Sequence, residues 1–333
     1  MKRFALLIIT SAILFSCSRA PQAKSEFILA TVCTITFYDY VRPQVYRDIF
    51  TRLKEIENRM SAYIDSSDVN RINRAAGLNP VQVHPDVFGV IELAVHFAKI
   101  SDGAFDPTVG PLVFLWGIGF DHEKLPAQEE IEKVLPLVGW EDIELDRSNY
   151  SVFLKKTGMA LDLGAIAKGF AADEAAAIIK KAGIKRAIID LGGNILLVGE
   201  RKNKGPWRVG IQNPLENRGN YIGIAEVFEN SVVTSGVYER FFEENGVRYH
   251  HLFSPSSGYP ADNGLLSVTI ITGVSAVADA LSTAVFVLGY DKGRALVDSL
   301  DAVEAIFVFT DKSIKMSGGV NFTLNNTNYT IMQ

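Results

Sequence analysis

Apolar residues recur every three or four positions in several stretches of the chain, which is the spacing of an amphipathic helix. Residues 45–60 show this pattern clearly. Pro107 and Pro111 disfavour a regular helix or a central strand, so residues 103–112 are expected to form a shaped loop. The helices expected from the patterns cover residues 45–60, 68–77, 86–100, 121–138, 162–183 and 275–288.

Strand patterns outnumber these helices. They cover residues 27–40, 143–150, 151–156, 186–191, 195–198, 207–211, 222–228, 231–234, 249–253, 266–272, 302–310 and 313–316. Neighbouring strands are joined by short turns, of which Gly192-Gly193 is an example. The sequence therefore predicts an α+β fold with mostly antiparallel sheets and packed helices, and not an alternating doubly wound fold.

The first residues resemble a bacterial lipoprotein signal. Positive charge at Met1-Lys2-Arg3 precedes an apolar run, 4–15, that is too short to span a bilayer comfortably. We expect residues 1–16 to be the signal peptide, Cys17 the lipidated first mature residue, and 17–26 a tether. The mature protein would then be lipid-anchored on the periplasmic side of the cell membrane, or on an outer membrane. A plain signal peptide, or a short anchor whose cysteine has no function, is the alternative.

Composition narrows the class of protein further. The chain has 333 residues, 48% of them hydrophobic, which allows a sizeable core in one or two domains. Its net charge of −5 argues against a nucleic-acid partner. Only two cysteines, Cys17 and Cys33, are present, so no disulfide framework holds the fold together.

A central stretch, residues 161–173 (LDLGAIAKGFAAD), combines a carboxylate, small residues and a cation. Asp162 is expected to be the N-cap of a helix that Gly183 ends. Lys168 would lie about a turn and a half further along, next to the free amides and the positive dipole end of that helix. This arrangement suits a bound anion. The alternative is an ordinary amphipathic helix with a cap and a solvated lysine.

A second polar constellation lies in residues 276–284 (AVADALSTA). Asp279 and Thr283 stand four positions apart, so a carboxylate and a hydroxyl share one face of a helix. A carboxylate among small apolar residues needs a partner or a cation, because its burial alone costs several kcal/mol. Oxygen ligands of this kind suit Mg²⁺. The alternative is a polar stripe that faces solvent.

Two adjacent histidines precede a loop rich in Pro, Ser and Gly, in residues 248–260 (RYHHLFSPSSGYP). On a strand, His250 and His251 point to opposite faces, so only one serves a given site. His251 is nearer the loop and is the better candidate for proton transfer, although a structural role for the pair stays open. Zinc motifs, a Walker loop, a Rossmann glycine pattern and a nucleophile elbow are all missing from the sequence.

Taken in order, these motifs resemble those of the ApbE-like flavin transferases, the FAD:protein FMN transferases. The resemblance covers residues 27–333 as one domain, and it implies an ApbE-like, T-fold-related α+β architecture. The matching pieces are MSAYIDSSDVNRIN, GAFDPTVGPL, LDLGAIAKGFAAD, DLGGN, HHLFSPSSGYP and ADALSTA.

The resemblance also implies roles for single residues. The positions matched to FAD contacts are Leu29, Tyr63, Ala104, Phe105, Asp106, Asp162, Lys168 and Phe253. Those matched to magnesium ligands are Ala165, through its carbonyl, Asp279, Ser282 and Thr283. His251 matches the histidine tied to catalysis, in which Asp279 also takes part. Ser282 stands where some members have a carboxylate, and Leu29-Ala30-Thr31 where Met-Gly-Thr is commoner.

The activity that the resemblance implies is Mg²⁺-dependent transfer of FMN from FAD to a threonine hydroxyl of an acceptor flavoprotein, with release of AMP. The acceptors would be subunits with a Ser/Thr flavinylation motif, for example of redox-driven ion pumps. Attack by water would instead make the protein an FAD pyrophosphatase, and one protein can have both activities. A flavin-binding or trafficking lipoprotein without catalysis is a further alternative. A generic solute-binding lipoprotein is disfavoured because the sequence lacks two similar α/β lobes.

Overall fold

The computed structural model describes residues 21–201 and 205–332. Its helices are α1 (Pro43–Met60), α2 (Asp68–Arg74), α3 (Pro85–Ile100), α4 (Gly110–Trp116), α5 (Gln128–Val134), α6 (Ala167–Lys181) and α7 (Ser275–Asp298), with 3₁₀ turns at Leu135–Leu137 and Trp140–Asp142. Its strands are β1 (Gln22–Ile28), β2 (Thr31–Phe37), β3 (Val81–Gln82), β4 (Ile143–Asp146), β5 (Ser151–Leu154), β6 (Ala187–Leu191), β7 (Asn194–Val198), β8 (Trp207–Gln212), β9 (Tyr221–Val227), β10 (Ser231–Gly236), β11 (Phe241–Glu244), β12 (Val247–His250), β13 (Leu265–Thr272), β14 (Glu304–Phe309), β15 (Ser313–Met316), β16 (Phe322–Leu324) and β17 (Thr330–Ile331).

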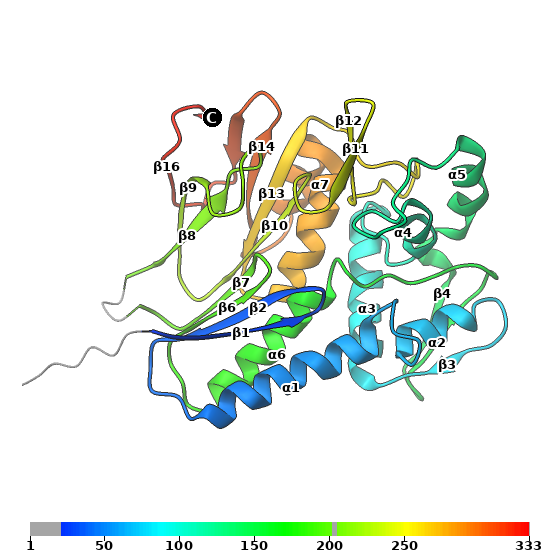
Figure 1. Ribbon diagram of the computed structural model, residues 1–333, viewed down its shortest axis with the longest axis horizontal. Coiled ribbons are helices and arrows are strands. Elements are labelled where there is room, and N and C mark those ends of the chain that lie inside the picture. The colour runs from blue at the N-terminus through cyan, green and yellow to red at the C-terminus, as the bar shows by residue number, and fades with distance from the viewer. Residues whose placement is uncertain (1–20, 202–204, 333) are drawn as a thin grey trace, which may run out of the picture.

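A nine-stranded sheet with the order β1-β2-β6-β7-β10-β13-β14-β15-β17 forms the centre of the molecule. Its neighbouring strands are antiparallel except β15 and β17. Helices α6 and α7 pack against each other and against this sheet, and α1 packs on α6 (Figure 1). Smaller sheets join β16-β9-β8, β3-β5-β4 and β11-β12. The predicted α+β fold with mostly antiparallel sheets is confirmed.

Two hairpins differ from the expected strands. The stretch 27–40 is not one strand, because Leu29 and Ala30, at φ of 56° and 55°, turn the chain between β1 and β2. Both residues adopt the left-handed conformation that a two-residue hairpin turn requires, without the glycine or asparagine that usually signals it. The turn at Asn245-Gly246 makes the β11–β12 hairpin. The strand expected at 249–253 corresponds to β12, which begins earlier, at Val247, and ends at His250.

Two helices also differ from expectation. The expected loop 103–112 ends in a helix, α4, because Pro111 lies in its first turn, where the missing N–H costs nothing. In the expected helix 121–138, only Gln128–Val134 is α-helical. Helix α7 is kinked at Gly289, whose conformation is non-helical (φ 75°). The predicted helix 275–288 matches the part before this kink, and the part after it, up to Asp298, was not predicted.

Besides the main core, a smaller apolar cluster is built from Leu112, Trp116, Ile118, Ile131 and Phe253. The indole N–H of Trp116 donates to the carbonyl of Gly258 at 3.0 Å. This cluster fastens α4 and α5 to the loop that follows β12. In the part of the chain that the structure describes, no helix is both long and apolar enough to cross a bilayer. Cys17, with the predicted lipidation, lies outside the described residues.

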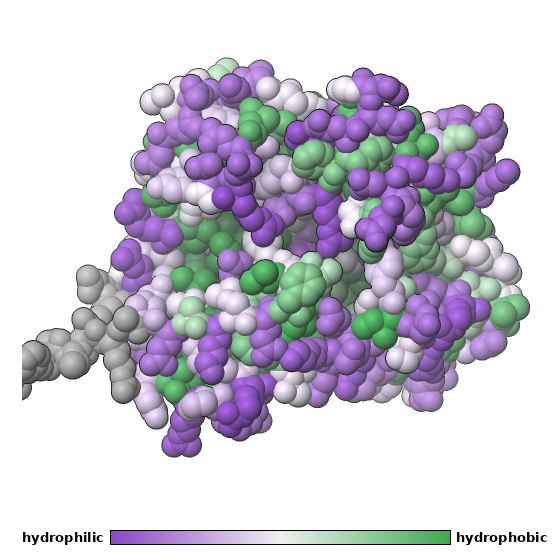
Figure 2. Space-filling model, viewed as in Figure 1, coloured by the Kyte–Doolittle hydropathy of each residue, from purple (hydrophilic) through white to green (hydrophobic). Residues whose placement is uncertain are grey.

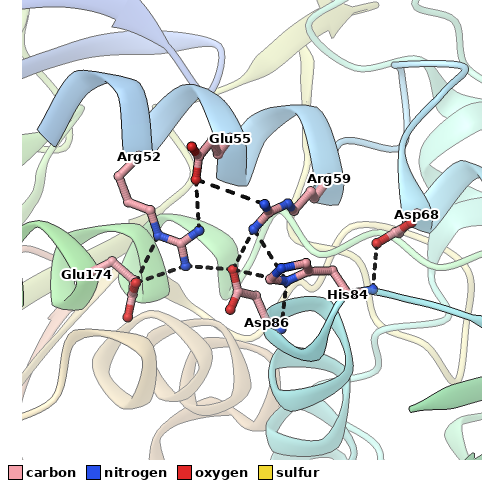
Figure 3. A network of polar contacts seen from close by, with 7 residues as sticks. All are labelled: Arg52, Glu55, Arg59, Asp68, His84, Asp86 and Glu174. Atoms are coloured by element: carbon pink, nitrogen blue, oxygen red, sulfur yellow. Dashed lines mark hydrogen bonds and ion pairs between the residues drawn. The ribbon is translucent and has the colours of Figure 1, made fainter. Parts of the chain in front are cut away.

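A network of ion pairs ties α1 to α3 and α6 (Figure 3). Asp86, in the first turn of α3, accepts from Arg52 at 2.6 Å and from Arg59 at 2.8 Å, both on α1. Arg52 also donates to Glu174 on α6 at 2.9 Å. Charges shared among several partly buried partners stabilise more than isolated surface pairs do, so this network helps to fix α6 in place.

Candidate functional site

Helices α6 and α7 cap each other at the centre of the site. The Oδ2 atom of Asp279 in α7 accepts the amide N–H of Gly169 in α6 at 2.9 Å. In return, the carboxylate of Asp173 in α6 accepts the amides of Ser275 and Ala276, which begin α7, each at 2.9 Å. These bonds satisfy amides that lack a partner within their own helix. The two predicted constellations, 110 residues apart, are thereby brought together.

The absence of a side chain at Gly169 permits this contact. A Cβ atom there would meet the carbonyl oxygen of Ser275 and would lie 2.6 Å from the Cα atom of Ala276. The glycine is therefore required by the close approach of the two helices, and not by a need for unusual dihedral angles.

Asp162 does not cap α6. The helix begins at Ala167 and has Ile166 at the N-cap position, without a side-chain cap. Asp162 instead precedes the helix and accepts the amide of Gly164 at 2.7 Å. Burial raises the pKa of its carboxyl group, against the nearby charges of Arg240 and Lys168. The carboxylate of Asp162 therefore lies in a turn before the helix, where it binds the amide of Gly164 and not an amide of α6. The predicted C-terminal glycine, Gly183, is confirmed with φ of 75°.

Lys168 lies between two oxygen atoms. Its Nζ donates to the carbonyl of Gly164 at 3.0 Å and lies 3.7 Å from Oδ1 of Asp279. Asp279 is only 4% exposed, so its Oδ1 atom is a buried carboxylate oxygen whose partner is a lysine ammonium. The expectation that this carboxylate needs a partner or a cation is therefore met within the protein, by the Gly169 amide and the Lys168 ammonium.

Ser235 of β10 contacts the hydroxyl groups of two α7 residues next to Asp279, Ser282 and Thr283. Ser235 lies 2.8 Å from the Ser282 hydroxyl and 3.2 Å from the Thr283 hydroxyl. Ser282 is fully buried and also donates to the carbonyl of Asp279 at 2.9 Å. Its oxygen is thus engaged within the protein, which makes Thr283 the better hydroxyl ligand. Within residues 21–201 and 205–332, no group of three or more His, Cys, Asp and Glu side chains is placed to hold a metal. A magnesium ion held by the predicted ligands Asp279, Thr283 and the Ala165 carbonyl would therefore have a single carboxylate ligand.

An aromatic cluster lies next to these groups. The ring of Tyr63, which is 50% exposed, packs against Phe114 and Phe120 with centroid distances of 5.8 and 4.7 Å. Burial and the charge of Asp162 raise the pKa of the Tyr63 phenol, so the two residues are electrostatic neighbours. The exposed tyrosine face suits stacking on a planar ring system.

The loop at Ala104, Phe105 and Asp106 is held by its own hydrogen bonds. The carboxylate of Asp106 accepts the amide and hydroxyl of Thr108 at 2.7 and 2.6 Å and the amide of Trp140 at 3.0 Å. Burial raises the pKa of this carboxyl group. Phe105 is 3% exposed and belongs to the core. Contacts from Phe105 to a ligand would therefore come from its backbone, while Asp106 fixes the loop.

This loop is fastened to the central stretch. The amide of Asp162 donates to the carbonyl of Pro107 at 2.9 Å, and the amide of Gly110 donates to the carbonyl of Ala160 at 3.2 Å. Asn73 of α2 pairs with both backbone groups of Leu161 at 2.7 and 3.0 Å. Three segments that are distant in sequence thus form one wall beside Asp162.

The two histidines have different surroundings, as expected. His250 is buried, and its Nε2 bonds to the carbonyl of Ala261 at 3.1 Å. The backbone N–H and the Nδ1 of His251 both lie 3.2 Å from the carbonyl oxygen of Arg240. Since a carbonyl can only accept, Nδ1 carries the proton and Nε2 keeps a free lone pair. Burial, together with the positive charge of Arg240, lowers the pKa of His251 to about 3.

Two further predicted contacts can be placed. Phe253 is buried in the smaller apolar cluster, with its ring 5.7 Å from that of Trp116, so it can offer a ligand only its backbone. Leu29 lies at the tip of the β1–β2 hairpin, where its amide donates to Glu57 at 2.7 Å. Figure 2 shows the surface hollowed between the β1–β2 hairpin and the β11–β12 hairpin.

Two small cavities open on the surface of the described residues, one of them beside Asp173. One, of about 360 Å³, is lined by α6, β7 and Glu229, and the other, of about 440 Å³, by residues 71–82. Neither includes a predicted site residue. Both are shallow features of the surface, so the site is defined by its convergent polar groups and not by cavity size.

Sequence reasoning missed several residues that shape the site: Phe114, Phe120, Asp173, Ser235 and Arg240. Asp173 was within the central stretch, but its bond to α7 depends on a contact that no local pattern reveals. Ser235 and Arg240 lie near the ends of strands and belong to no recognised motif.

The chain is similar to known proteins in both sequence and structure. The sequence profile of the ApbE family matches residues 29–307. The FAD:protein FMN transferase of Treponema pallidum is 37% identical over 316 residues, covering 90% of this chain and 87% of that protein. The crystal structure of the ApbE protein of Thermotoga maritima superimposes with a TM-score of 0.81 at 33% identity, covering 92% of this chain and 98% of the other. The flavin transferase ApbE of Vibrio cholerae gives a TM-score of 0.78 at 26% identity, over 93% and 99% of the two chains. The chain belongs to the ApbE family.

Proposed function

We propose that this protein transfers FMN from FAD to a threonine hydroxyl of an acceptor flavoprotein and releases AMP, with Mg²⁺ as the metal. The observation that carries the proposal is the buried carboxylate of Asp279, held by the amide of Gly169 with its other oxygen facing a cation. Such a carboxylate suits a metal that contacts a diphosphate. The names of the relatives point to the same substrate.

The metal would be held by Asp279, Thr283 and the carbonyl of Ala165. When bound, Mg²⁺ would supply neutralising charge to the diphosphate as the bond to AMP breaks. Lys168, whose ammonium lies 3.7 Å from Asp279 and donates to the carbonyl of Gly164, would contact a phosphate oxygen in place of that carboxylate. The flavin ring would stack on Tyr63, and the loop fixed by Asp106 would offer backbone groups to the dinucleotide.

In this proposal, His251 accepts the proton of the attacking hydroxyl. Its Nδ1–H is bound to the carbonyl of Arg240, which fixes the ring and leaves Nε2 as the acceptor. The lowered pKa keeps the imidazole neutral at physiological pH. A bound polyanion would offset the charge of Arg240 and strengthen the base at the moment when it is needed.

We also propose that Cys17 carries a lipid that holds the protein on the periplasmic side of the membrane. The support is the sequence pattern of the first seventeen residues. Replacing Cys17 by serine should release the protein from the membrane fraction and abolish incorporation of radiolabelled palmitate. Persistent membrane association in that variant would contradict lipid anchoring.

The test of the activity is incubation with FAD, Mg²⁺ and an acceptor subunit that has a threonine flavinylation motif. FMN attached to the acceptor threonine, detected by in-gel fluorescence and peptide mass, supports transfer. An acceptor with valine in place of that threonine is the matched control. Free FMN and AMP in the absence of an acceptor would indicate hydrolysis, and unchanged FAD would indicate a carrier.

A further inference from the structure

Arg240 occupies a junction between three parts of the site. It directly precedes β11, and its carbonyl oxygen holds both the backbone N–H and the Nδ1 of His251. Its side-chain stem lies over Gly119: a Cβ atom on that glycine would be 3.3 Å from Cδ of Arg240. Gly119 is followed by Phe120, whose ring packs on Tyr63. The guanidinium is therefore carried to the side of the aromatic cluster.

The charge of Arg240 is not neutralised by an ion pair. Neighbouring Arg218 pairs with Glu239 at 2.6 Å, and Arg248 pairs with Glu243 at 2.9 Å. Among the ion pairs of the described residues, Arg240 takes part in none, and its side chain is exposed. An exposed arginine that keeps its charge unpaired next to a polar site is available to an anionic ligand.

The charge of Arg240 acts on three of the predicted site residues, and at Asp162 and His251 it acts together with the charge of Lys168. It opposes the rise of the carboxyl pKa at Asp162, and it lowers the pKa of His251 after burial does. It also opposes the rise of the phenol pKa at Tyr63. Lys168 already faces a carboxylate, so Arg240 is the cation that remains for additional negative charge at this site.

Resting on the proposed function, we propose that Arg240 binds phosphate oxygens of the dinucleotide substrate. A guanidinium can contact two phosphate oxygens at once, which fixes orientation as well as charge. Lys168 and Arg240 would then hold the diphosphate between them. If the flavin ring stacks on the aromatic cluster, Arg240 would lie at the flavin end of the diphosphate, because its stem packs over Gly119 beside Phe120.

The test compares FAD with riboflavin, which has the same ring but no phosphate. Arg240→Gln removes the charge and keeps the carbonyl that holds His251. We expect FAD binding, followed by quenching of flavin fluorescence, to weaken about ten- to hundred-fold, as for the loss of a charged hydrogen bond. Riboflavin binding should stay unchanged. Arg240→Lys should retain most of the FAD affinity, and Arg218→Gln, at a paired surface arginine, should change neither ligand.

The outcomes separate this inference from the proposed function. Equal weakening of FAD and riboflavin would show that Arg240 only shapes the ring site, and unchanged FAD binding would show that it contacts no phosphate; either result overturns the inference. If the wild-type protein binds FAD but transfers no FMN, the proposed function fails while the comparison of ligands still decides the role of Arg240.

Discussion

Removing the charge of Asp279 without removing its hydrogen bond is the sharpest test of the metal site. In Asp279→Asn, the side-chain amide oxygen can still accept the amide of Gly169, which lies 2.9 Å from Oδ2 in the native protein. Only the carboxylate charge, and with it the contact to Lys168 at 3.7 Å, is lost. We expect stability to fall by about 1 kcal/mol, the value typical of a charge near a helix N-terminus.

Activity should fall much further than stability. A preorganised charge that stabilises the transition state contributes about 3–4 kcal/mol, so FMN transfer should slow by about 10²- to 10³-fold at saturating FAD. Asp279→Ala should lose a similar amount of activity. It should also lose about 1–3 kcal/mol more stability, because the buried amide of Gly169 is left without an acceptor.

The assay measures FMN transfer to the acceptor over a range of Mg²⁺ concentrations, with urea unfolding of each variant alongside. Asp298→Asn, at an exposed aspartate later in α7 that pairs with Arg294, is the matched control and should leave transfer unchanged. Transfer by Asp279→Asn at the wild-type rate, with the wild-type dependence on Mg²⁺, would refute the assignment of this carboxylate to the metal.

Three further predictions follow from single contacts. Gly169→Ala should lower the free energy of unfolding by about 1–3 kcal/mol, because its Cβ would meet the backbone that begins α7. Gly89→Ala, the control, has open space on the exposed side of α3 and should raise the free energy of unfolding slightly. Equal urea midpoints for the two variants would refute this packing argument. His250 has a pKa lowered to about 4 by burial, so between pH 6.5 and 4 the unfolded chain binds a proton that the folded chain does not, and stability should fall with pH by up to about 1.4 kcal/mol per unit. Urea unfolding between pH 7 and 4.5 should show that the free energy of unfolding of His250→Gln falls less steeply than that of the wild type. The same dependence on pH in both proteins would contradict this role of His250. Tyr63→Phe should bind FAD like the wild type and Tyr63→Ala about tenfold more weakly, as fluorescence titration would measure; similar affinities for both would show that the ring does not stack on the flavin.

Regular elements were predictable where the periodicity was strong. The helix at 45–60 and the strands on either side of Gly192-Gly193 follow from local pattern, since each buries one clear face. The start of α4 was not predictable from the pattern, because a proline normally disfavours a helix and is compatible with one only in its first turn. The turn at Leu29 and Ala30 carries no turn residues, so only pairing of β1 with β2 reveals it.

The sequence yields candidate residues for the site but not their arrangement. Asp279 stood out because a carboxylate among small apolar residues demands a partner, and the structure supplies one in the Gly169 amide. The prediction that Asp162 is the N-cap of α6 was wrong, because the carboxylate binds the amide of Gly164, which lies before the helix. Arg240 could not be found, since its importance comes from tertiary neighbours and not from its sequence context.

The mutual capping of α6 and α7 has a consequence for catalysis. Asp279 is fixed by the Gly169 amide, and the helix that carries Asp279 is fixed at its start by Asp173. The carboxylate is therefore held in place by the fold alone, and Lys168 provides a cation for its second oxygen. If a metal and a diphosphate bind as proposed, Lys168 has to leave Asp279, but the carboxylate itself keeps its place, and fixed charges lower a barrier most effectively when they need not reorient. The same bonds that join the two helices thus also prepare the site for phosphoryl transfer.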